Sequence, residues 1–289
     1  MKLNIGPIII SIEGMTEADI PENSRLFLTK DSRKADVCYR FHWVEVLPSP
    51  ESDWKEVFRR PDICVWQNGS LEARRLAVGT PDAAYALYKE SSAQETEVYF
   101  LESLKRDLRI DTIFVSCLAL ERQMAAHGGY ILHCCYLSYR GQGVLFSGPS
   151  GIGKSTHASL WCRYLNEAHV VNGDRCLIYK NPKGEYTACP WPVCGSSGIC
   201  RKEEWPVRAI VFMAQAPHNE IREASPMQLF KMLSSQLTVN WWNANFTRKA
   251  LDAAQEMLER VGMCTYACNL SEEAPRMLNN YLKEKEWII

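Results

Sequence analysis

The sequence predicts a mixed α/β protein with two regions, a β-rich stretch over residues 1–110 and an α/β domain over residues 111–289. Two observations predict this division. In the first region the apolar runs are short and are separated by Pro, Gly, Asp and Asn, as is typical of strands joined by turns. In the second, strand-length runs alternate with segments in which apolar residues recur at helical spacing.

The β-rich region shows strand patterns but no set of residues with catalytic chemistry. Its tryptophans Trp43, Trp54 and Trp66 are expected to be core or interface aromatics. The expected strands are Leu3–Ile12, Ser24–Leu28, Val37–Trp43, Ile63–Trp66, Glu72–Val78 and Glu97–Leu101.

The second region opens with a helix that has Asp111 and Thr112 as candidate caps and ends at Gly128-Gly129. Later helices are expected over Lys154–Leu165, from the Ser225-Pro226 cap, around Leu251–Val261 and over Glu272–Lys285. The expected strands are Tyr130–Tyr139, Gly143–Ser147, His169–Val171, Cys176–Tyr179, Glu185–Ala188 and Arg208–Met213.

Bulk composition excludes several classes of protein. A net charge of −1 argues against a surface that binds nucleic acid. No apolar run approaches the roughly 18 residues of a membrane span, and Met1–Ile5 has a strand pattern rather than that of a signal peptide. We therefore expect a cytoplasmic protein whose partners include neither nucleic acid nor membrane. The twelve cysteines include no pair of Cys-x2-Cys units, so reduced, partly buried thiols are expected instead of a zinc site.

The most specific motif is a glycine-rich segment between an expected strand and an expected helix. Glycines allow backbone N–H groups to close around phosphate oxygens, Lys154 supplies positive charge, and the Ser155 hydroxyl can bind Mg²⁺. The alternative is a Gly-rich turn without a ligand. The motif predicts binding of a nucleoside triphosphate, ATP or GTP. It reads Gly148-Pro149-Ser150-Gly151-Ile152-Gly153-Lys154-Ser155-Thr156 and fits Gly-x4-Gly-Lys-[Ser/Thr] throughout.

Two residues outside this segment are candidates for catalysis. Asp174 follows the strand after the loop helix, where a carboxylate can hold Mg²⁺ or orient an acceptor. It also belongs to Asn-Gly-Asp, a sequence that suits a plain turn. His133 lies in the strand before the loop strand, where a lone histidine is more often a hydrogen-bonded core residue.

Several polar residues nearby allow two interpretations, one functional and one structural. Arg175 or Arg201 can stabilise phosphate charge, or either can be a solvated surface arginine. The Gly195–Gly198 segment, with Lys202 beyond it, can approach phosphates or form a surface turn. His157 is expected to be a surface or packing residue.

Together these residues resemble the catalytic domain of HPr kinase/phosphorylase, within the phosphoenolpyruvate carboxykinase-like P-loop proteins. The resemblance covers residues 111–215 and extends to Pro190-Trp191 and Gly195–Gly198. It implies a mixed sheet, ATP and Mg²⁺ as cofactors, and His133 in the active site. The family has two adjacent aspartates for metal binding and base catalysis, and here Gly173 replaces the first, which leaves Asp174 alone.

The expected activity is transfer of the γ-phosphoryl group of ATP to a hydroxyl of a peptide, a protein or a small molecule. Lys154, Asp174 and His133 are the expected catalytic residues, and Ser155 and Asp174 the expected metal ligands. An ATP-dependent carboxykinase remains an alternative, as does a nucleotide-binding module without transferase activity, which Gly173 motivates. The sequence does not identify the acceptor. It does not determine the oligomeric state either, so a homo-oligomer stays open.

Overall fold

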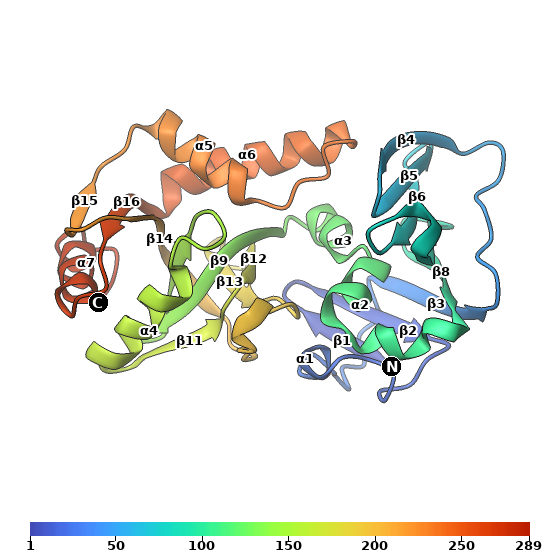
Figure 1. The fold of residues 1–289 in the computed structure, drawn as a ribbon, viewed down its shortest axis with the longest axis horizontal. Coiled ribbons are helices and arrows are strands. Elements are labelled where there is room, and N and C mark those ends of the chain that lie inside the picture. Colours follow the sequence, from blue (N-terminus) through green and yellow to red (C-terminus); the bar gives the residue numbers. More distant parts are fainter. The chain divides into compact units, whose positions relative to one another are not determined.

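The computed structural model describes all residues from Met1 to Ile289 (Figure 1). The chain divides into two compact units, Met1–Gln123 and Met124–Ile289, and the division falls inside helix α3 (Leu120–Ala126). Each unit contains a sheet with both parallel and antiparallel strand pairs, so the prediction of a mixed α/β protein is confirmed. No helix is both long enough and apolar enough to cross a lipid bilayer.

The first unit is built on one eight-stranded sheet with the strand order β1-β2-β3-β8-β7-β6-β5-β4. The pairs β2–β3 and β3–β8 are parallel, whereas the remaining pairs are antiparallel. Its elements are β1 (Lys2–Ile5), β2 (Ile8–Glu13), α1 (Glu22–Arg25), β3 (Val37–Val44), β4 (Lys55–Arg60), β5 (Ile63–Asn68), β6 (Leu71–Ala77), η1 (Pro81–Ala83), β7 (Ala84–Glu90), β8 (Glu95–Leu101), η2 (Glu102–Arg109), α2 (Asp111–Cys117) and the start of α3.

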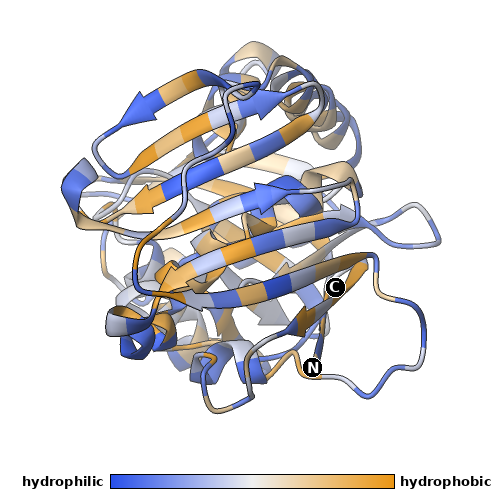
Figure 2. Cartoon of the chain, turned by 90° about the vertical axis from the view of Figure 1, so that its right-hand side faces the viewer, coloured by the Kyte–Doolittle hydropathy of each residue, from blue (hydrophilic) through white to orange (hydrophobic).

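Side chains of this sheet alternate between a buried and a more open face, as the two-residue period of a strand requires. Figure 2 shows hydrophilic and hydrophobic residues alternating along several of its strands. On the buried face, Tyr39, Tyr88 and Phe100 are fully enclosed. Ion pairs are buried there too, because Arg74 on β6 bonds Glu72 and reaches Glu121 on α3.

Several predictions for this unit are wrong in detail. Leu3–Ile12 is not one strand but a hairpin, because Gly6 adopts a φ of 53° between β1 and β2. Most of Ser24–Leu28 is not a strand, since helix α1 begins after Pro21 and only Leu28 forms a bridge, with Leu3. Strands β4 and β7 were not expected. Asp111 is not a cap, because it lies inside α2 and accepts a hydrogen bond from Asn23.

The second unit has a sheet with the order β10-β9-β12-β13-β14-β16-β15, in which β11 also pairs with β9. Strand β10 additionally pairs in parallel with β14, so that it lies between β9 and β14. Its elements are β9 (Tyr130–Tyr139), β10 (Gln142–Ser147), α4 (Lys154–Tyr164), β11 (Ala168–Asn172), β12 (Arg175–Lys180), β13 (Tyr186–Pro190), η3 (Gly195–Ser197), β14 (Trp205–Gln215), β15 (Glu220–Arg222), α5 (Pro226–Gln236), α6 (Ala244–Arg260), β16 (Gly262–Cys268) and α7 (Glu273–Glu284).

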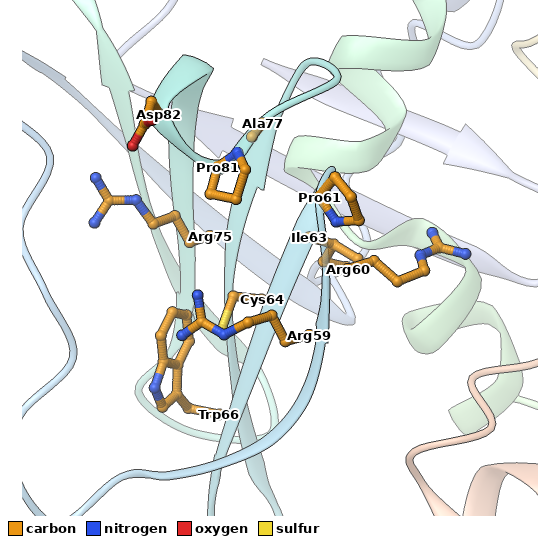
Figure 3. Close-up of a pocket in the computed structure, with 10 residues that line it drawn as sticks. All are labelled: Arg59, Arg60, Pro61, Ile63, Cys64, Trp66, Arg75, Ala77, Pro81 and Asp82. Carbon is orange, nitrogen blue, oxygen red and sulfur yellow. The ribbon is translucent and has the colours of Figure 1, made fainter.

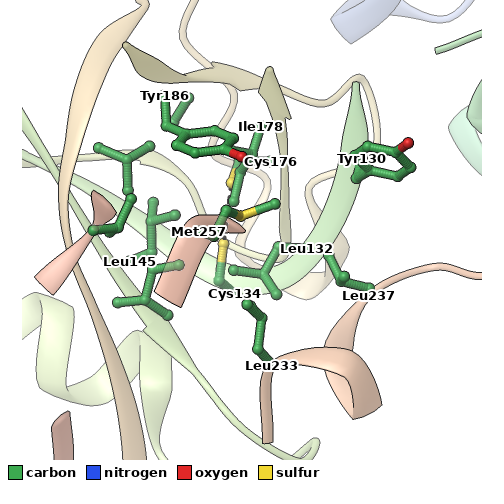
Figure 4. Close-up of a cluster of buried hydrophobic side chains, with 14 of the residues drawn as sticks. Tyr130, Leu132, Cys134, Leu145, Cys176, Ile178, Tyr186, Leu233, Leu237 and Met257 are labelled. Carbon is green, nitrogen blue, oxygen red and sulfur yellow. Dashed lines mark hydrogen bonds between the residues drawn. The ribbon is translucent and has the colours of Figure 1, made fainter. Parts of the chain in front are cut away.

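Two buried clusters lie on opposite faces of this sheet, because alternate residues of β9 and β10 belong to different clusters. One cluster packs the sheet against α5 and α6, and Figure 4 shows Leu132, Leu145, Leu233 and Met257 within it. The other packs the sheet against α4 and α7 through residues such as Trp161. The strand that leads into the glycine-rich segment is therefore fixed between helices on both sides.

Most expected elements of this unit are present. The predicted cap of α5 is confirmed, because Ser225 Oγ accepts a hydrogen bond from the Gln228 amide and the Gln228 side chain accepts one from the Ser225 amide. The helix expected from Asp111 to Gly128 is wrong in one respect. It is interrupted at Ala119, whose φ of 44° ends α2 before α3 begins. Strands β15 and β16 were missed.

Candidate functional site

The glycine-rich segment connects the end of β10 with the start of α4. Gly148, Gly151 and Gly153 have φ values of 144°, 80° and 98°, a region that favours glycine. The predicted loop helix is confirmed, since α4 begins at Lys154 directly after Gly153. Gln215, at the end of β14, holds the loop by donating to the Gly151 carbonyl at 3.3 Å. The motif therefore has the strand–loop–helix context that phosphate binding requires.

The side chain of Lys154 folds back into this loop. Its Nζ donates to the carbonyl oxygens of Gly148 and Pro149 at 2.9 and 3.0 Å, and only 7% of the residue is exposed. An ammonium group has three donors, so one remains for an anion. Burial lowers the pKa of Lys154, and nearby Asp174 acts in the opposite direction. The loop thus holds a buried cation, and the acid that acts on it, Asp174, is itself partly exposed to solvent.

Asp174 lies in the turn between β11 and β12, and buried Asn172 builds that turn. The Asn172 side-chain oxygen accepts from the amides of Asp174 and Arg175 at 2.9 and 3.0 Å. Its side-chain nitrogen donates to the Trp191 carbonyl at 2.7 Å. Asn172 is fully buried, so this short-range network fixes the turn and with it the direction of the Asp174 carboxylate.

His133 and Asp174 come together across the neighbouring strands β9 and β12. His133 Nε2 lies 3.7 Å from Asp174 Oδ1, and the carboxylate also accepts from Arg175 Nε at 3.1 Å. The other ring nitrogen, Nδ1, lies 3.2 Å from Gln236 Oε1 at the end of α5. Burial and then the Lys154 charge lower the pKa of His133 below 6.5. The ring is thus neutral at pH 7 and can accept a proton.

The tautomer of His133 follows from its neighbours. Gln236 Oε1 can only accept, so Nδ1 carries the proton and Nε2 presents a lone pair on the side of Asp174. Gln236 was not among the predicted site residues, since 103 positions separate it from His133. No short-range pattern reveals such a contact.

Gly173 has a structural reason to lack a side chain. A Cβ placed there would lie 2.0 Å from Ser197 Oγ and 2.4 Å from Ser197 Cβ. Ser197 is itself held in place, because its hydroxyl donates to the Cys194 carbonyl at 2.7 Å. The segment that contains η3 therefore fills the space in which a carboxylate at position 173 would lie. This site has one acid in the turn because its neighbour is packed against another loop.

That segment also contacts Asp174. A Cβ on Gly195, whose φ is 60°, would lie 3.0 Å from Asp174 Cβ. The Gly195–Gly198 segment is thus not an isolated surface turn, although whether it meets a ligand stays a prediction. Arg175 lies beside Asp174, whereas the Arg201 side chain is exposed and acts electrostatically on Cys162 and Glu203. Of the two arginines, Arg175 is the one at the site.

The oxygen donors here suit a Mg²⁺ ion that is shared with phosphates. Ser155 Oγ lies 3.4 Å from the Gly173 carbonyl, which brings the start of α4 close to the Asp174 turn. The chain contains no group of three His, Cys, Asp or Glu side chains that could hold a metal ion together. One hydroxyl and one carboxylate are few ligands, but Mg²⁺ usually keeps several waters and binds substrate phosphates. Ser155 and Asp174 would hold such an ion.

Two thiols beside the site, those of Cys134 and Cys176, are buried. All twelve cysteines are free, and the sulfurs of Cys134 and Cys176, which follow His133 and Arg175 in the chain, lie 3.4 Å apart. Burial raises the pKa of Cys134 well above its ordinary value. The Cys134 thiol therefore stays protonated, and both side chains belong to the buried core of the sheet (Figure 4).

His157 is a core residue rather than a surface residue. It accepts from Trp161 Nε1 at 3.0 Å, packs against Phe146 and Tyr266, and burial lowers its pKa to about 4. The unfolded chain binds this proton below pH 6.5 while the folded chain does not, so stability is lost as the pH falls from 6.5 toward 4. Between pH 7.5 and pH 5 we expect a loss of about 2 kcal/mol from this group.

Urea unfolding of wild type and His157→Phe at a series of pH values measures this contribution. The substitution should remove that part of the pH dependence, while His218→Gln, at a side chain that is 70% exposed, should leave it unchanged. If the free energy of unfolding depended on pH equally in wild type and His157→Phe, the assignment would be wrong.

Comparisons with known proteins place the chain in a family. A family model described as SynChlorMet cassette protein ScmC matches residues 99–283, so the chain belongs to this family. No curated protein matches the chain. Among solved structures, the Hpr(Ser) kinase/phosphatase from Coxiella burnetii is similar at 13% identity over 54% of this chain and 93% of that chain. Its TM-score of 0.32 is too low to establish a shared fold.

Proposed function

We propose that this member of the ScmC family is an ATP-dependent phosphotransferase that transfers the γ-phosphoryl group to a hydroxyl. The observation that carries the proposal is the arrangement of three groups at the end of β10. They are the loop that begins at Gly148, the buried Lys154 ammonium, and the Asp174 carboxylate 3.7 Å from His133. A phosphate-binding loop with a cation and an adjacent acid–base pair is what phosphoryl transfer requires.

Each group has a role that its environment supports. The loop amides and Lys154 bind the β- and γ-phosphates and balance the charge that spreads over the transferred group. Ser155 and Asp174 would hold Mg²⁺, which would supply further charge neutralisation when bound. Asp174 orients the acceptor hydroxyl, and His133 accepts its proton at Nε2, because burial favours the unprotonated ring and Gln236 holds the one ring proton at Nδ1.

The single carboxylate favours one rival, a module that binds the nucleotide without transferring phosphate. Enzymes of the resembled family use two adjacent acids, and here packing of Ser197 excludes the first of them. We consider transfer better supported, since His133 lies where it can take over the role of the base while Asp174 serves the metal.

The experiment is a γ-phosphate assay with purified full-length protein. Labelled ATP and Mg²⁺ are supplied alone and together with desalted cell extract, and label in released phosphate and in any acceptor is measured. Wild type should release or transfer label, and Asp174→Asn should lower the rate at least about 100-fold because the metal loses its carboxylate. Asp252→Asn, a change at an exposed aspartate of α6, is the matched control and should retain the rate.

Two outcomes decide against this function. If ATP binds but neither wild type nor Asp252→Asn releases label under any condition, the protein is a nucleotide-binding module. If Asp174→Asn is as active as wild type, the transfer chemistry lies elsewhere.

A further inference from the structure

A pocket lies entirely within the first unit, apart from the phosphate loop. It has a volume of about 290 Å³ and is formed by β4, β5, β6 and the η1 turn (Figure 3). Its size is at the lower end of that of small-molecule sites. The residues that line it include three arginines, a tryptophan, a cysteine and one acid: Arg59, Arg60, Arg75, Trp66, Cys64 and Asp82.

Strand pairing brings the polar residues of this pocket to one face of the sheet. Arg59 on β4 pairs with Cys64 on β5, and Cys64 pairs with Arg75 on β6. Directly paired residues share a face, so the three form a row across the strands. Trp66 follows Cys64 by two positions and lies on the same face. Figure 3 shows the Arg59 guanidinium near the sulfur of Cys64 and the Trp66 ring.

The three arginines differ in how their charges are balanced. Arg59 is held by both oxygens of Glu56, at 2.8 and 2.5 Å. Arg60 is held in the same bidentate way by Asp62, at 3.1 and 2.9 Å. The Arg75 side chain is partly buried but forms no ion pair or hydrogen bond. One partly buried cation in the pocket is therefore not balanced by an acid of the chain itself.

Two further features limit which ligands could balance the charge of Arg75. Asp82 at the η1 turn is exposed and makes no ion pair with Arg75, although the Arg75 side chain extends in its direction in Figure 3. A dianion on Arg75 would face repulsion from Asp82, whereas a monoanion would be repelled less. The Trp66 ring offers a flat apolar wall, and its indole N–H donates to no group of the chain.

We propose that this pocket binds a small organic carboxylate with a flat apolar body. Its carboxylate would accept hydrogen bonds from the Arg75 guanidinium, and its body would pack against Trp66. Planar guanidinium groups match carboxylates in bidentate geometry, which favours this ligand over a neutral one. The site does not depend on the nucleotide-binding function of the second unit.

Titration of the full-length protein with benzoate, benzamide and phenylphosphate tests the assignment. Binding is followed by calorimetry and by the NMR shift of the Trp66 indole N–H, which is assigned with Trp66→Phe. Benzoate should bind and shift this signal, and benzamide, its neutral isostere, should bind at least tenfold more weakly. Arg75→Gln should weaken benzoate binding at least tenfold, since one charge-assisted pair is lost.

Two variants control this test. Arg109→Gln removes the same charge at an exposed residue without an ion pair and should change the affinity less than twofold. Arg75→Lys keeps the charge without the planar fork and should bind with intermediate affinity. The proposal is wrong if benzoate leaves the Trp66 signal unchanged at about 20 mM, well above the affinity range of a specific site. It is also wrong if Arg75→Gln or benzamide binds equally well, or if phenylphosphate binds more tightly than benzoate.

Discussion

Lys154→Met should abolish phosphoryl transfer while the protein stays folded. Methionine fills nearly the same space and packs well in an apolar environment. The ammonium it replaces is already penalised by burial, which lowers its pKa, so the loss of its bonds to Gly148 and Pro149 costs little stability. The charge that develops on the transferred group would lose its nearest protein cation, and we expect a rate at least about 100- to 1,000-fold lower.

Initial rates of γ-phosphate release measure this effect, and thermal unfolding verifies the fold. Lys183→Met is the matched control, because Lys183 is an exposed lysine in the β12–β13 turn of the same unit. The control should keep the wild-type rate. Turnover by Lys154→Met within tenfold of wild type would show that the loop cation is not part of the catalytic machinery.

Arg74→Met should produce the largest loss of stability in the first unit. Arg74 is 3% exposed, and it donates to Glu72 at 2.6 Å and to Glu121 at 2.5 Å. Burial alone would lower its pKa, but Glu121 and Glu72 outweigh this and raise the pKa above its ordinary value. Removal of the guanidinium leaves two enclosed carboxylates without this partner, a change that typically costs about 3–5 kcal/mol.

Amide hydrogen exchange in β6 and β7 measures this loss within the unit concerned. Arg75→Met is a sharp control, since Arg75 is the next residue on the same strand, points to the opposite face and forms no ion pair. It should change the free energy of opening by less than about 0.5 kcal/mol. A loss below about 1 kcal/mol in Arg74→Met would mean that α3 is held to the sheet by other contacts.

The part of the site that sequence could predict is the part encoded over short distances. The strand before Gly148 and the helix from Lys154 are where the motif requires them, because glycine conformation and helix periodicity are local properties. The Asn172 turn was also predictable from sequence. Asn side chains commonly form turns by accepting hydrogen bonds from backbone amides two and three residues ahead, as Asn172 does here. Whether these residues bind ATP and Mg²⁺ stays a prediction.

The features of the site that could not be predicted depend on packing between segments far apart in the sequence. Gln236 reaches His133 only because α5 ends beside β9, and Ser197 excludes a side chain at position 173 only because η3 folds onto the turn. Strand β4 was missed for a different reason. It is an edge strand of largely exposed, charged residues with a bulge between Glu56 and Phe58, so it lacks the alternation that marks a half-buried strand.

Binding of the triphosphate by the segment 148–156 is most directly tested by amide hydrogen exchange of the wild-type protein with Mg²⁺ and a non-hydrolysable ATP analogue. We expect slower exchange in peptides that cover Gly148–Thr156 and the Asp174 turn, and no such change in Lys154→Met at the same nucleotide concentration. If the analogue binds and these peptides exchange at their free rates while others become protected, the nucleotide site lies elsewhere and the proposed function is wrong.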